Sequence, residues 1–294
     1  MERATEIRAH IALLLMVVIW AVNFSVAKVA LEELSPLAFN ALRFPMAAAL
    51  LYVVVRARGI VPLPARAELP RVLALGLLGN FMYQMFFIFG LDRTRAGNAS
   101  LLLASTPIIT ALLSAQVGHE RVRPRVWVGV IATFGGILLV VLGGRGQIAA
   151  GRETVVGDLL MFGASVAWAF YTVGSRPLVE RYGALTVTAW TLWIGTAGII
   201  CAGMLDTLRT NWDTVGAGTW AAVVYAGVLS IGVAYIIWYY GVGVLGNTRT
   251  ATYSNIVPVI ALAVAWLWLG EVPTVSQLIG TTVIVGGVTV AQSG

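Results

Sequence analysis

Long apolar runs, nearly free of charged residues, recur along the whole chain and are separated by short polar or glycine-rich segments. A helix of about 20 apolar residues is long enough to cross the ~30 Å hydrocarbon core of a bilayer, and each run has roughly that length. The pattern therefore predicts ten transmembrane helices, at residues 11–30, 37–55, 72–91, 97–117, 126–143, 157–175, 184–205, 219–240, 250–269 and 276–293.

The connections between these runs leave no room for a soluble domain, since the longest lie at 55–71 and 144–156. Composition agrees with this. The chain is 59% hydrophobic and 11% charged, with a mean hydropathy of +0.88, whereas a soluble domain is about 45–50% apolar and about 25% charged. We therefore predict an all-α integral membrane protein, with a single membrane domain over residues 1–294 that is surrounded by the lipid bilayer.

The net charge of +6 is explained by the distribution of the basic residues. If the N-terminus is placed in the cytoplasm, the cytoplasmic side receives twelve of the basic residues and the opposite side six, with Arg43 unassigned. Cytoplasmic loops of membrane proteins carry an excess of Lys and Arg. We therefore expect both termini in the cytoplasm, and no nucleic-acid partner.

The two halves of the chain repeat each other. WAVNFSVAK (20–28) returns as WAFYTVGSR (168–176), an offset of 148 that aligns Trp20 with Trp168 and Lys28 with Arg176. Later landmarks recur at an offset of 151, and a three-residue insertion reconciles the two offsets. The later pairs are Gly76 with Gly227, Gly90 with Gly241, Pro107 with Pro258, Glu120 with Glu271, Gly129 with Gly280, and Gly135-Gly136 with Gly286-Gly287. We expect internal repeats at 10–146 and 156–293.

Each repeat contains five of the predicted spans. Because five is odd, the second repeat must enter the membrane from the opposite side to the first. Inverted-topology repeats are characteristic of transporters, whose substrate site lies between the halves near the midplane. Duplicated bundles can also form channels or membrane-embedded enzymes, so these alternatives remain.

Proline occurs in mid-span at equivalent places in the two repeats, in Ser-Thr-Pro (105–107) and Val-Pro (257–258). Proline removes a helix hydrogen bond and clashes with the preceding turn, so both helices should kink or open there. Matched interruptions of this kind indicate a binding site and moving parts. We therefore expect Pro107 and Pro258 to lie in the gating helices, although single prolines are common in membrane helices.

Aromatic and neutral polar side chains also recur in mid-span. Symmetry-related aromatics beside Asn or Gln are better explained as the lining of a cavity than as lipid-facing or interfacial residues. The candidate substrate-binding residues are Trp20 and Asn23 on the first span, Tyr83, Gln84 and Phe87 on the third, Trp168 and Tyr171 on the sixth, Tyr235 and Trp238 on the eighth, and Asn255 on the ninth.

Charged residues are expected to lie outside the site. All thirteen acidic residues and both histidines fall at span ends or in loops. We therefore expect no metal, cofactor or catalytic residue. We also expect no carboxylate buried within the spans, and hence neither an organic-cation substrate nor proton coupling through a carboxylate. Arg43 lies less than two turns from its helix start, so we expect it to reach the interface. The alternative is that it binds a substrate carboxylate. Lys28 is interpreted as an interfacial anchor.

The tryptophan–alanine opening of each half, the mid-helix prolines and WLGEVPTVSQLIGTTVIVGGV (268–288) together resemble the EamA repeat of the drug/metabolite transporter superfamily. GHERVRPRVWVGVIATFGGILLV (118–140) is a looser counterpart. Within that superfamily the chain most resembles the YddG-type exporters of aromatic and other hydrophobic amino acids. The resemblance implies a ten-helix, basket-shaped protein that opens alternately to each side, with Tyr83, Gln84, Phe87 and Trp168 lining the site.

The resulting hypothesis is a monomeric exporter of neutral, largely aromatic or hydrophobic amino acids in the bacterial inner membrane. Tyr83, Phe87, Trp168 and Trp238 would bury the apolar side chain, and Asn23, Gln84 and Asn255 would bind the zwitterion. One alternative is a transporter of another small metabolite, a nucleotide sugar or sugar phosphate. A lipid scramblase and a membrane-embedded enzyme are the others.

Overall fold

The computed structural model describes residues 2–59, 64–117, 124–143 and 152–292, and these residues are almost entirely helical. His119 and Glu120, which the sequence places at a span end, lie outside the described residues. Eight helices are long and apolar enough to cross a membrane: Arg3–Ala30, Pro36–Ala57, Arg66–Arg93, Ala96–Gln116, Glu153–Tyr182, Ala184–Arg209, Ala217–Leu245 and Arg249–Leu269. Two shorter apolar helices, Val126–Val140 and Val275–Val290, complete the ten. The prediction of an all-α protein with ten helices is confirmed.

Six of the ten spans are single helices over their whole length: α1 (Glu2–Ala30), α2 (Pro36–Ala57), α7 (Pro124–Gly143), α8 (Arg152–Tyr182), α9 (Ala184–Arg209) and α14 (Val275–Gln292). The other four are composite. The third joins α3 (Leu69–Gly76), a π-helical segment (Leu77–Met82) and α4 (Tyr83–Arg93), and the fourth joins α5 (Ala96–Leu103) and α6 (Thr106–Gln116). The eighth joins α10 (Ala217–Val224), a second π segment (Tyr225–Val233) and α11 (Ala234–Leu245), and the ninth joins α12 (Asn247–Tyr253), a 3₁₀ turn (Ser254–Ile256) and α13 (Val257–Leu269).

The interruptions of the composite spans lie at equivalent positions of the two repeats. The fourth span resumes at Thr106 and the ninth at Val257, an offset of 151, so the break expected before each proline is present in both halves. The same offset carries the π segment at Leu77–Met82 onto 228–233, inside the second π segment. The sequence analysis did not predict the π segments. They widen the helix and leave main-chain carbonyls available to side chains from neighbouring helices.

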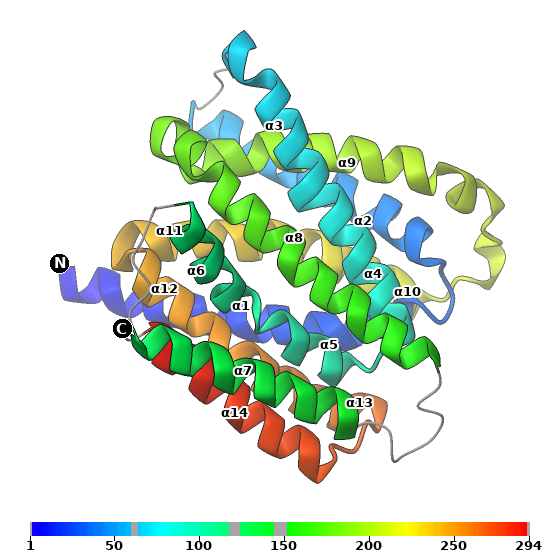
Figure 1. Ribbon diagram of the computed structural model, residues 1–294. Coiled ribbons are helices and arrows are strands. Elements are labelled where there is room, and N and C mark those ends of the chain that lie inside the picture. Colours follow the sequence, from blue (N-terminus) through cyan, green and yellow to red (C-terminus); the bar gives the residue numbers. More distant parts are fainter. Residues whose placement is uncertain (1, 60–63, 118–123, 144–151, 293–294) are drawn as a thin grey trace.

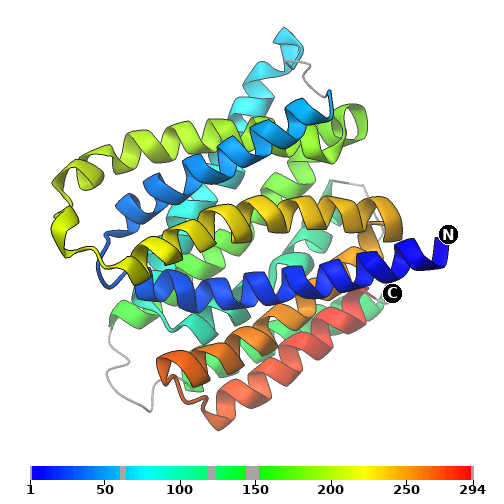
Figure 2. The same cartoon turned by 180° about the vertical axis from the view of Figure 1, so that it is seen from behind.

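The two halves are interwoven rather than set side by side. α1, from the first half, packs against α11 and α13 of the second half. α8, from the second half, packs against α4 and α6 of the first. Figure 1 shows α8 crossing α4 in front of the bundle, and Figure 2 shows α1 lying between the yellow α10–α11 helix and the orange α13 helix. Each half therefore supplies the first helix to the third and fourth spans of the other.

α7 and α14 form a tight antiparallel pair along one side of the bundle (Figure 1). Gly136 packs on the backbone of Gly280, and Gly287 packs on the backbone of Gly129. The 151-residue offset interchanges these two contacts, since it relates 129 to 280 and 136 to 287. The repeat thus relates the two glycine contacts to each other. An inverted duplication produces such paired contacts between the helices at its symmetry axis.

The two ends of the bundle differ in the connections that they hold. The terminal end holds the start of α1 and the end of α14, which lie close together in both views (Figures 1 and 2). The distal end holds the connections α1–α2, α4–α5, α9–α10 and α13–α14. Large apolar side chains point outward between these ends, among them Leu267, which is 81% exposed, and Ile131, which is 71% exposed. Such a surface is suited to lipid rather than water.

Candidate functional site

Four aromatic side chains from α4 and α8 form a continuous cluster between the halves. The ring of Tyr83 lies 5.0 Å from that of Trp168, and Trp168 lies 5.1 Å from Tyr171. Tyr83 also stacks on Phe87, one turn along α4, at 6.1 Å. These separations fall within the range of favourable aromatic contacts. We refer to these four residues as the aromatic cluster.

Trp20, the counterpart of Trp168 in the internal repeat, also packs against an aromatic ring of the other half. Trp20 of α1 lies 5.7 Å from Trp238 of α11, and its indole Nε1 donates a hydrogen bond of 3.0 Å to the carbonyl of Ser230 in the second π segment. Phe24, one turn after Trp20, lies 5.9 Å from Phe87. Phe24 therefore connects α1, which also carries Trp20, to the aromatic cluster, of which Phe87 is a member.

Two threonines of α9 form hydrogen bonds with tyrosines of α8 and α11. The Tyr171 hydroxyl and the Thr191 hydroxyl are hydrogen-bonded at 3.0 Å, and Tyr239 is hydrogen-bonded to Thr188. Tyr171 also fits closely against the π segment of the third span, where a Cβ added to Gly79 would lie 2.3 Å from its ring. Only a residue without a side chain admits the Tyr171 ring at this place.

The predicted polar residues Asn23 and Asn255 are both buried, on different helical spans. Asn23 is 7% exposed, and its Oδ1 atom has no hydrogen-bond partner among the described residues. Asn255 is 8% exposed and lies in the 3₁₀ turn between α12 and α13, three residues before Pro258. Tyr235 packs against a separate group of apolar residues that includes Phe44 and Ile231. A buried carbonyl oxygen without a donor is costly in an apolar interior, so Asn23 is suited to a ligand donor.

Arg43 corrects an expectation of the sequence analysis. We expected its side chain to reach the membrane interface, but it is 1% exposed and lies on the inner face of α2. Its Nε atom donates to Asn40 Oδ1 at 2.9 Å, and an Nη atom donates to Gln84 Oε1 at 2.8 Å. Gln84, a predicted site residue, is thus in direct contact with a buried cation.

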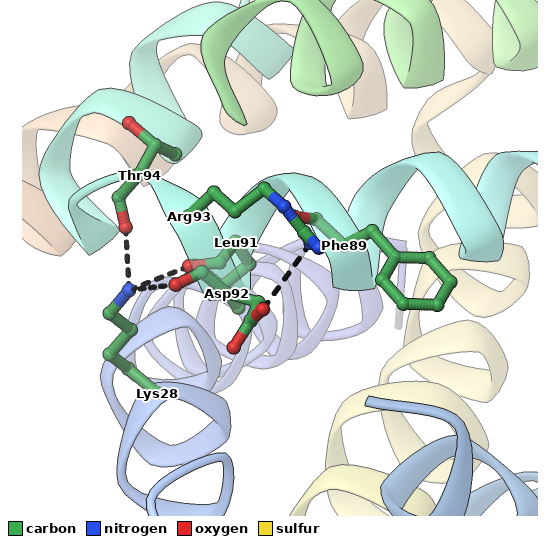
Figure 3. Close-up of polar contacts among 6 residues, drawn as sticks. All are labelled: Lys28, Phe89, Leu91, Asp92, Arg93 and Thr94. Atoms are coloured by element: carbon green, nitrogen blue, oxygen red, sulfur yellow. Dashed lines mark hydrogen bonds and ion pairs between the residues drawn. The ribbon is translucent and has the colours of Figure 1, made fainter. Parts of the chain in front are cut away.

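Lys28 belongs to a polar network at the distal end rather than to the lipid interface alone. Figure 3 shows its ammonium group at the turn after α4, where it donates to the carbonyls of Leu91, Asp92 and Thr94 at 2.8, 2.9 and 2.7 Å. The last carbonyls of a helix have no partner within the helix, and a positive charge stabilises them. Lys28 therefore fixes the end of α1 to the end of α4.

Glu271 connects the α13–α14 loop to the start of α5. Its carboxylate accepts hydrogen bonds from the backbone N–H groups of Ala96 and Gly97, at 3.1 and 3.2 Å. Beside it, Gln277 of α14 donates to Asn98 Oδ1 at 2.6 Å. These bonds join a loop and helix of the second half to a helix of the first, so they hold the distal end together across the halves.

Asp158 corrects a second expectation. It lies near the start of α8, as an acid at a span end, but it is only 4% exposed. The Thr94 hydroxyl donates to it, and Asn98 also hydrogen-bonds to it. The expectation that no carboxylate is buried is therefore wrong. Asp158 is nevertheless engaged by the distal network and not by the aromatic cluster.

Glu33 adds a contact at the same end, outside the spans. It accepts a hydrogen bond of 2.7 Å from the Gly216 N–H, which precedes α10. Hydrogen bonds from the Thr219 side chain and from this N–H lower the pKa of the Glu33 carboxyl below its ordinary value of 4.5. This contact joins the α1–α2 connection to the start of the eighth span.

The structure brings six of the ten predicted site residues together in aromatic contacts and places the Arg43 guanidinium beside one of them, Phe87. The predicted residues Tyr83, Phe87, Trp168 and Tyr171 lie together, as do Trp20 and Trp238. Asn40, Thr188 and Thr191 were missed. The signal for Asn40 was its i, i+3 spacing from Arg43, which places both on one helical face. Among the described residues no group of three His, Cys, Asp or Glu side chains is placed to hold a metal ion.

Comparison with known proteins agrees with this architecture. The model of the EamA-like transporter family matches the chain twice, at residues 7–142 and 155–292. A solved structure shares the fold with a TM-score of 0.69 and 23% sequence identity, covering 97% of this chain and 98% of that one.

Several curated relatives are similar over almost their whole length. An uncharacterized transporter of Archaeoglobus fulgidus is 30% identical, with 96% of each chain covered. A probable terminal-alkyne amino-acid exporter of Streptantibioticus cattleyicolor is 29% identical, covering 94% of this chain and 91% of the relative. A probable amino-acid metabolite efflux pump of Salmonella typhimurium is 29% identical, covering 93% and 91%. With ten helices in two interwoven halves, each of which matches the family model, this chain is a multi-pass membrane protein of the EamA-like transporter family in the drug/metabolite transporter superfamily.

Proposed function

We propose that the protein exports neutral, largely aromatic or hydrophobic amino acids. The observation that carries the proposal is the aromatic cluster, which brings α4 of the first half against α8 of the second at the place where a transporter with inverted repeats binds its substrate. Aromatic walls bind an apolar side chain by burying its surface, worth about 25 cal/mol per Å². Two similar relatives are named as amino-acid exporters or efflux pumps, and this supports the same substrate class here.

Three buried polar residues would bind the charged groups that every amino acid carries. Asn23 Oδ1 is buried and has no donor among the described residues, so it would accept a hydrogen bond from the substrate ammonium. Gln84 and Asn255 are likewise buried on the third and ninth spans. A site that hydrogen-bonds both ends of the zwitterion would select amino acids from other apolar molecules, because unpaired polar groups weaken the binding of analogues.

Transport would proceed by alternating access between the two interwoven halves. The distal end is held by Lys28, Glu271 and the Asn98–Gln277 pair, which connect different helices, so this end would be the closed one. Release of these bonds would accompany closure of the terminal end. The breaks before Pro107 and Pro258 would let the outer parts of the fourth and ninth spans move as the gates.

The orientation follows from the excess of basic residues at the terminal end. We place this end and both termini in the cytoplasm of a bacterial cell, with the protein in the inner membrane as a monomer. In this orientation the closed distal end faces away from the cytoplasm. The site would then receive substrate from the cytoplasm first, as an exporter must.

Transport of a sugar-linked phosphate is the competing function. Phosphates carry more negative charge than a carboxylate and would call for several cations in the site. Within the described spans, Arg43 lies beside the aromatic cluster while Lys28 is occupied by three carbonyls. One cation fits a single carboxylate better than a phosphate.

The proposed function is tested by flux in proteoliposomes. Vesicles loaded with labelled phenylalanine, methionine, threonine or a nucleotide sugar are compared with protein-free vesicles of the same lipid. We expect efflux of phenylalanine and methionine to exceed that from the protein-free control, with no gain for the nucleotide sugar. Faster efflux of the nucleotide sugar alone would establish the competing function instead.

A further inference from the structure

Arg43 places a full positive charge inside the bundle without a matching acid. It lies in the second turn of α2 and is 1% exposed. Among the described residues it is the largest side chain that is fully buried. No ion pair is formed between Arg43 and any acidic residue in the described parts of the chain. A buried charge is costly unless it is paired, so such a residue inside a membrane marks a functional position.

The groups that hold the guanidinium in this state are all neutral. Two are the amide oxygens of Asn40 and Gln84. The others are aromatic faces, with the guanidinium carbon 4.7 Å from the ring of Phe39, 5.5 Å from Phe44 and 5.7 Å from Phe87. Amide dipoles and cation–π contacts offset part of the desolvation cost. They leave the net charge uncompensated, and a mobile anion is able to supply the missing charge.

Arg43 is also adjacent to the aromatic cluster. The Phe87 ring that lies 5.7 Å from the guanidinium stacks on Tyr83, which in turn packs on Trp168. A cation at one end of an aromatic cluster fits a molecule that has an anionic group next to an apolar body, as an aromatic α-amino acid has.

We infer that Arg43 is the counter-ion of the substrate's α-carboxylate and the residue that distinguishes amino acids from amines. This inference rests on the proposed function. A guanidinium presents parallel N–H donors that match a carboxylate, so the carboxylate takes the place of the Gln84 amide oxygen. Gln84 then occupies Arg43 only while the site is empty.

The test uses the purified full-length protein and two ligands that differ only at the carboxyl group. Binding of labelled phenylalanine is measured in competition with unlabelled phenylalanine and with phenylalaninamide. In the wild type, phenylalaninamide should compete roughly tenfold or more weakly, as expected for loss of a charge-assisted hydrogen bond. In Arg43→Gln the two competitors should become equal. The control is Arg93→Gln, because Arg93 is exposed at the end of α4. This variant should keep the wild-type preference for phenylalanine over phenylalaninamide.

Gln84→Glu keeps the test informative if Arg43→Gln does not fold. This variant puts a carboxylate within reach of the guanidinium and satisfies its charge. It should be at least as heat-stable as the wild type but should lose phenylalanine binding, because the internal carboxylate competes with the substrate. If Gln84→Glu binds phenylalanine as the wild type does, Arg43 is only a structural residue.

The two proposals fail in different ways. A wild-type protein that binds phenylalanine and phenylalaninamide equally overturns the role of Arg43 and leaves amino-acid export standing. A wild-type protein that binds neither phenylalanine nor any other amino acid shows that the proposed function is wrong, and the carboxylate inference is overturned with it.

Discussion

Gly136 of α7 and Gly280 of α14 contact each other through their backbones. A Cβ atom added to Gly136 would lie 2.9 Å from the carbonyl oxygen of Gly280, and one added to Gly280 would lie 2.9 Å from the carbonyl oxygen of Gly136. Helices in membranes associate by such close packing, because lipid gives no hydrophobic drive between apolar surfaces. The α7–α14 pair therefore depends on residues without side chains.

Replacing Gly280 with alanine should separate α7 from α14. The new methyl group would meet both the Gly136 carbonyl and the Val140 side chain, whose Cγ2 atom would lie only 2.6 Å from the methyl carbon. Overpacking of this kind costs about 1–3 kcal/mol. We expect a lower midpoint of thermal unfolding for the purified Gly280→Ala protein. The control is Gly286→Ala on the same helix, where nothing lies within 4 Å, and an equal loss in both variants would refute the packing argument.

Trp168→Ala should reduce transport by removing the centre of the aromatic cluster. Trp168 contacts both Tyr83 and Tyr171, and an aromatic contact is worth about 0.5–1.5 kcal/mol beyond its burial. We expect phenylalanine efflux from proteoliposomes to fall roughly tenfold, with normal membrane insertion. Phe170→Ala, on the exposed face of the same helix, should leave efflux near the wild-type level. Unchanged efflux in Trp168→Ala would remove the aromatic cluster from the transport pathway.

Glu271→Gln should loosen the distal end. The negative charge of Glu271 strengthens its hydrogen bonds from the backbone N–H groups at the start of α5, where the helix dipole is positive. Weaker bonds should let this end open more often. The measurement is labelling of a cysteine introduced by Ser100→Cys, at a position on α5 that is 2% exposed, with the exposed Cys201 replaced by serine. Faster labelling by a maleimide reagent in the Glu271→Gln background is the expected result, and equal rates would show that Glu271 does not hold the end closed.

The spans, the repeat and the breaks before the prolines could be predicted because each has a local signature. A long apolar run reports a span directly, and the prolines at matching places of the two repeats indicate where the fourth and ninth spans break. Proline alone is a weaker signal, since α2 and α8 continue through Pro45 and Pro177. The π segments were missed for the opposite reason. Leu77–Met82 contains no residue type that demands a wider helix, and its geometry depends on contacts with other helices, such as the fit of Tyr171 against Gly79.

The errors at Arg43 and Asp158 share one physical cause. In a soluble protein the apolar face of a helix marks the core, whereas in a membrane both the lipid side and the core side are apolar. Distance from the helix end suggested that Arg43 could reach the interface. The side chain is buried because it lies on the face of α2 that is directed toward Asn40 and Gln84. The hydropathy of the chain does not show which face of the helix is directed inward. Asp158 is buried by Thr94 and Asn98 in the same way.

Lys28→Met should destabilise the protein and weaken closure of the distal end. The ammonium group makes three hydrogen bonds to carbonyls at the end of α4, and a methionine of similar length leaves them without a donor. Hydrogen bonds to charged groups contribute about 1.5–3 kcal/mol each when buried. Because Lys28 is only partly buried, we expect a total loss of a few kcal/mol, seen as a lower midpoint of thermal unfolding and as faster labelling at Ser100→Cys.

The matched control is the residue that the internal repeat aligns with Lys28. Arg176 forms an exposed pair with Glu180 on its own helix, at 2.9 Å, and exposed pairs contribute about 0–1 kcal/mol. Arg176→Met should therefore change neither the unfolding midpoint nor the labelling rate appreciably. The repeat aligns two basic residues, but only the one at the distal end has helix carbonyls to bind. Equal effects of the two substitutions would mean that Lys28 acts through its charge at the membrane surface and not through the end of α4.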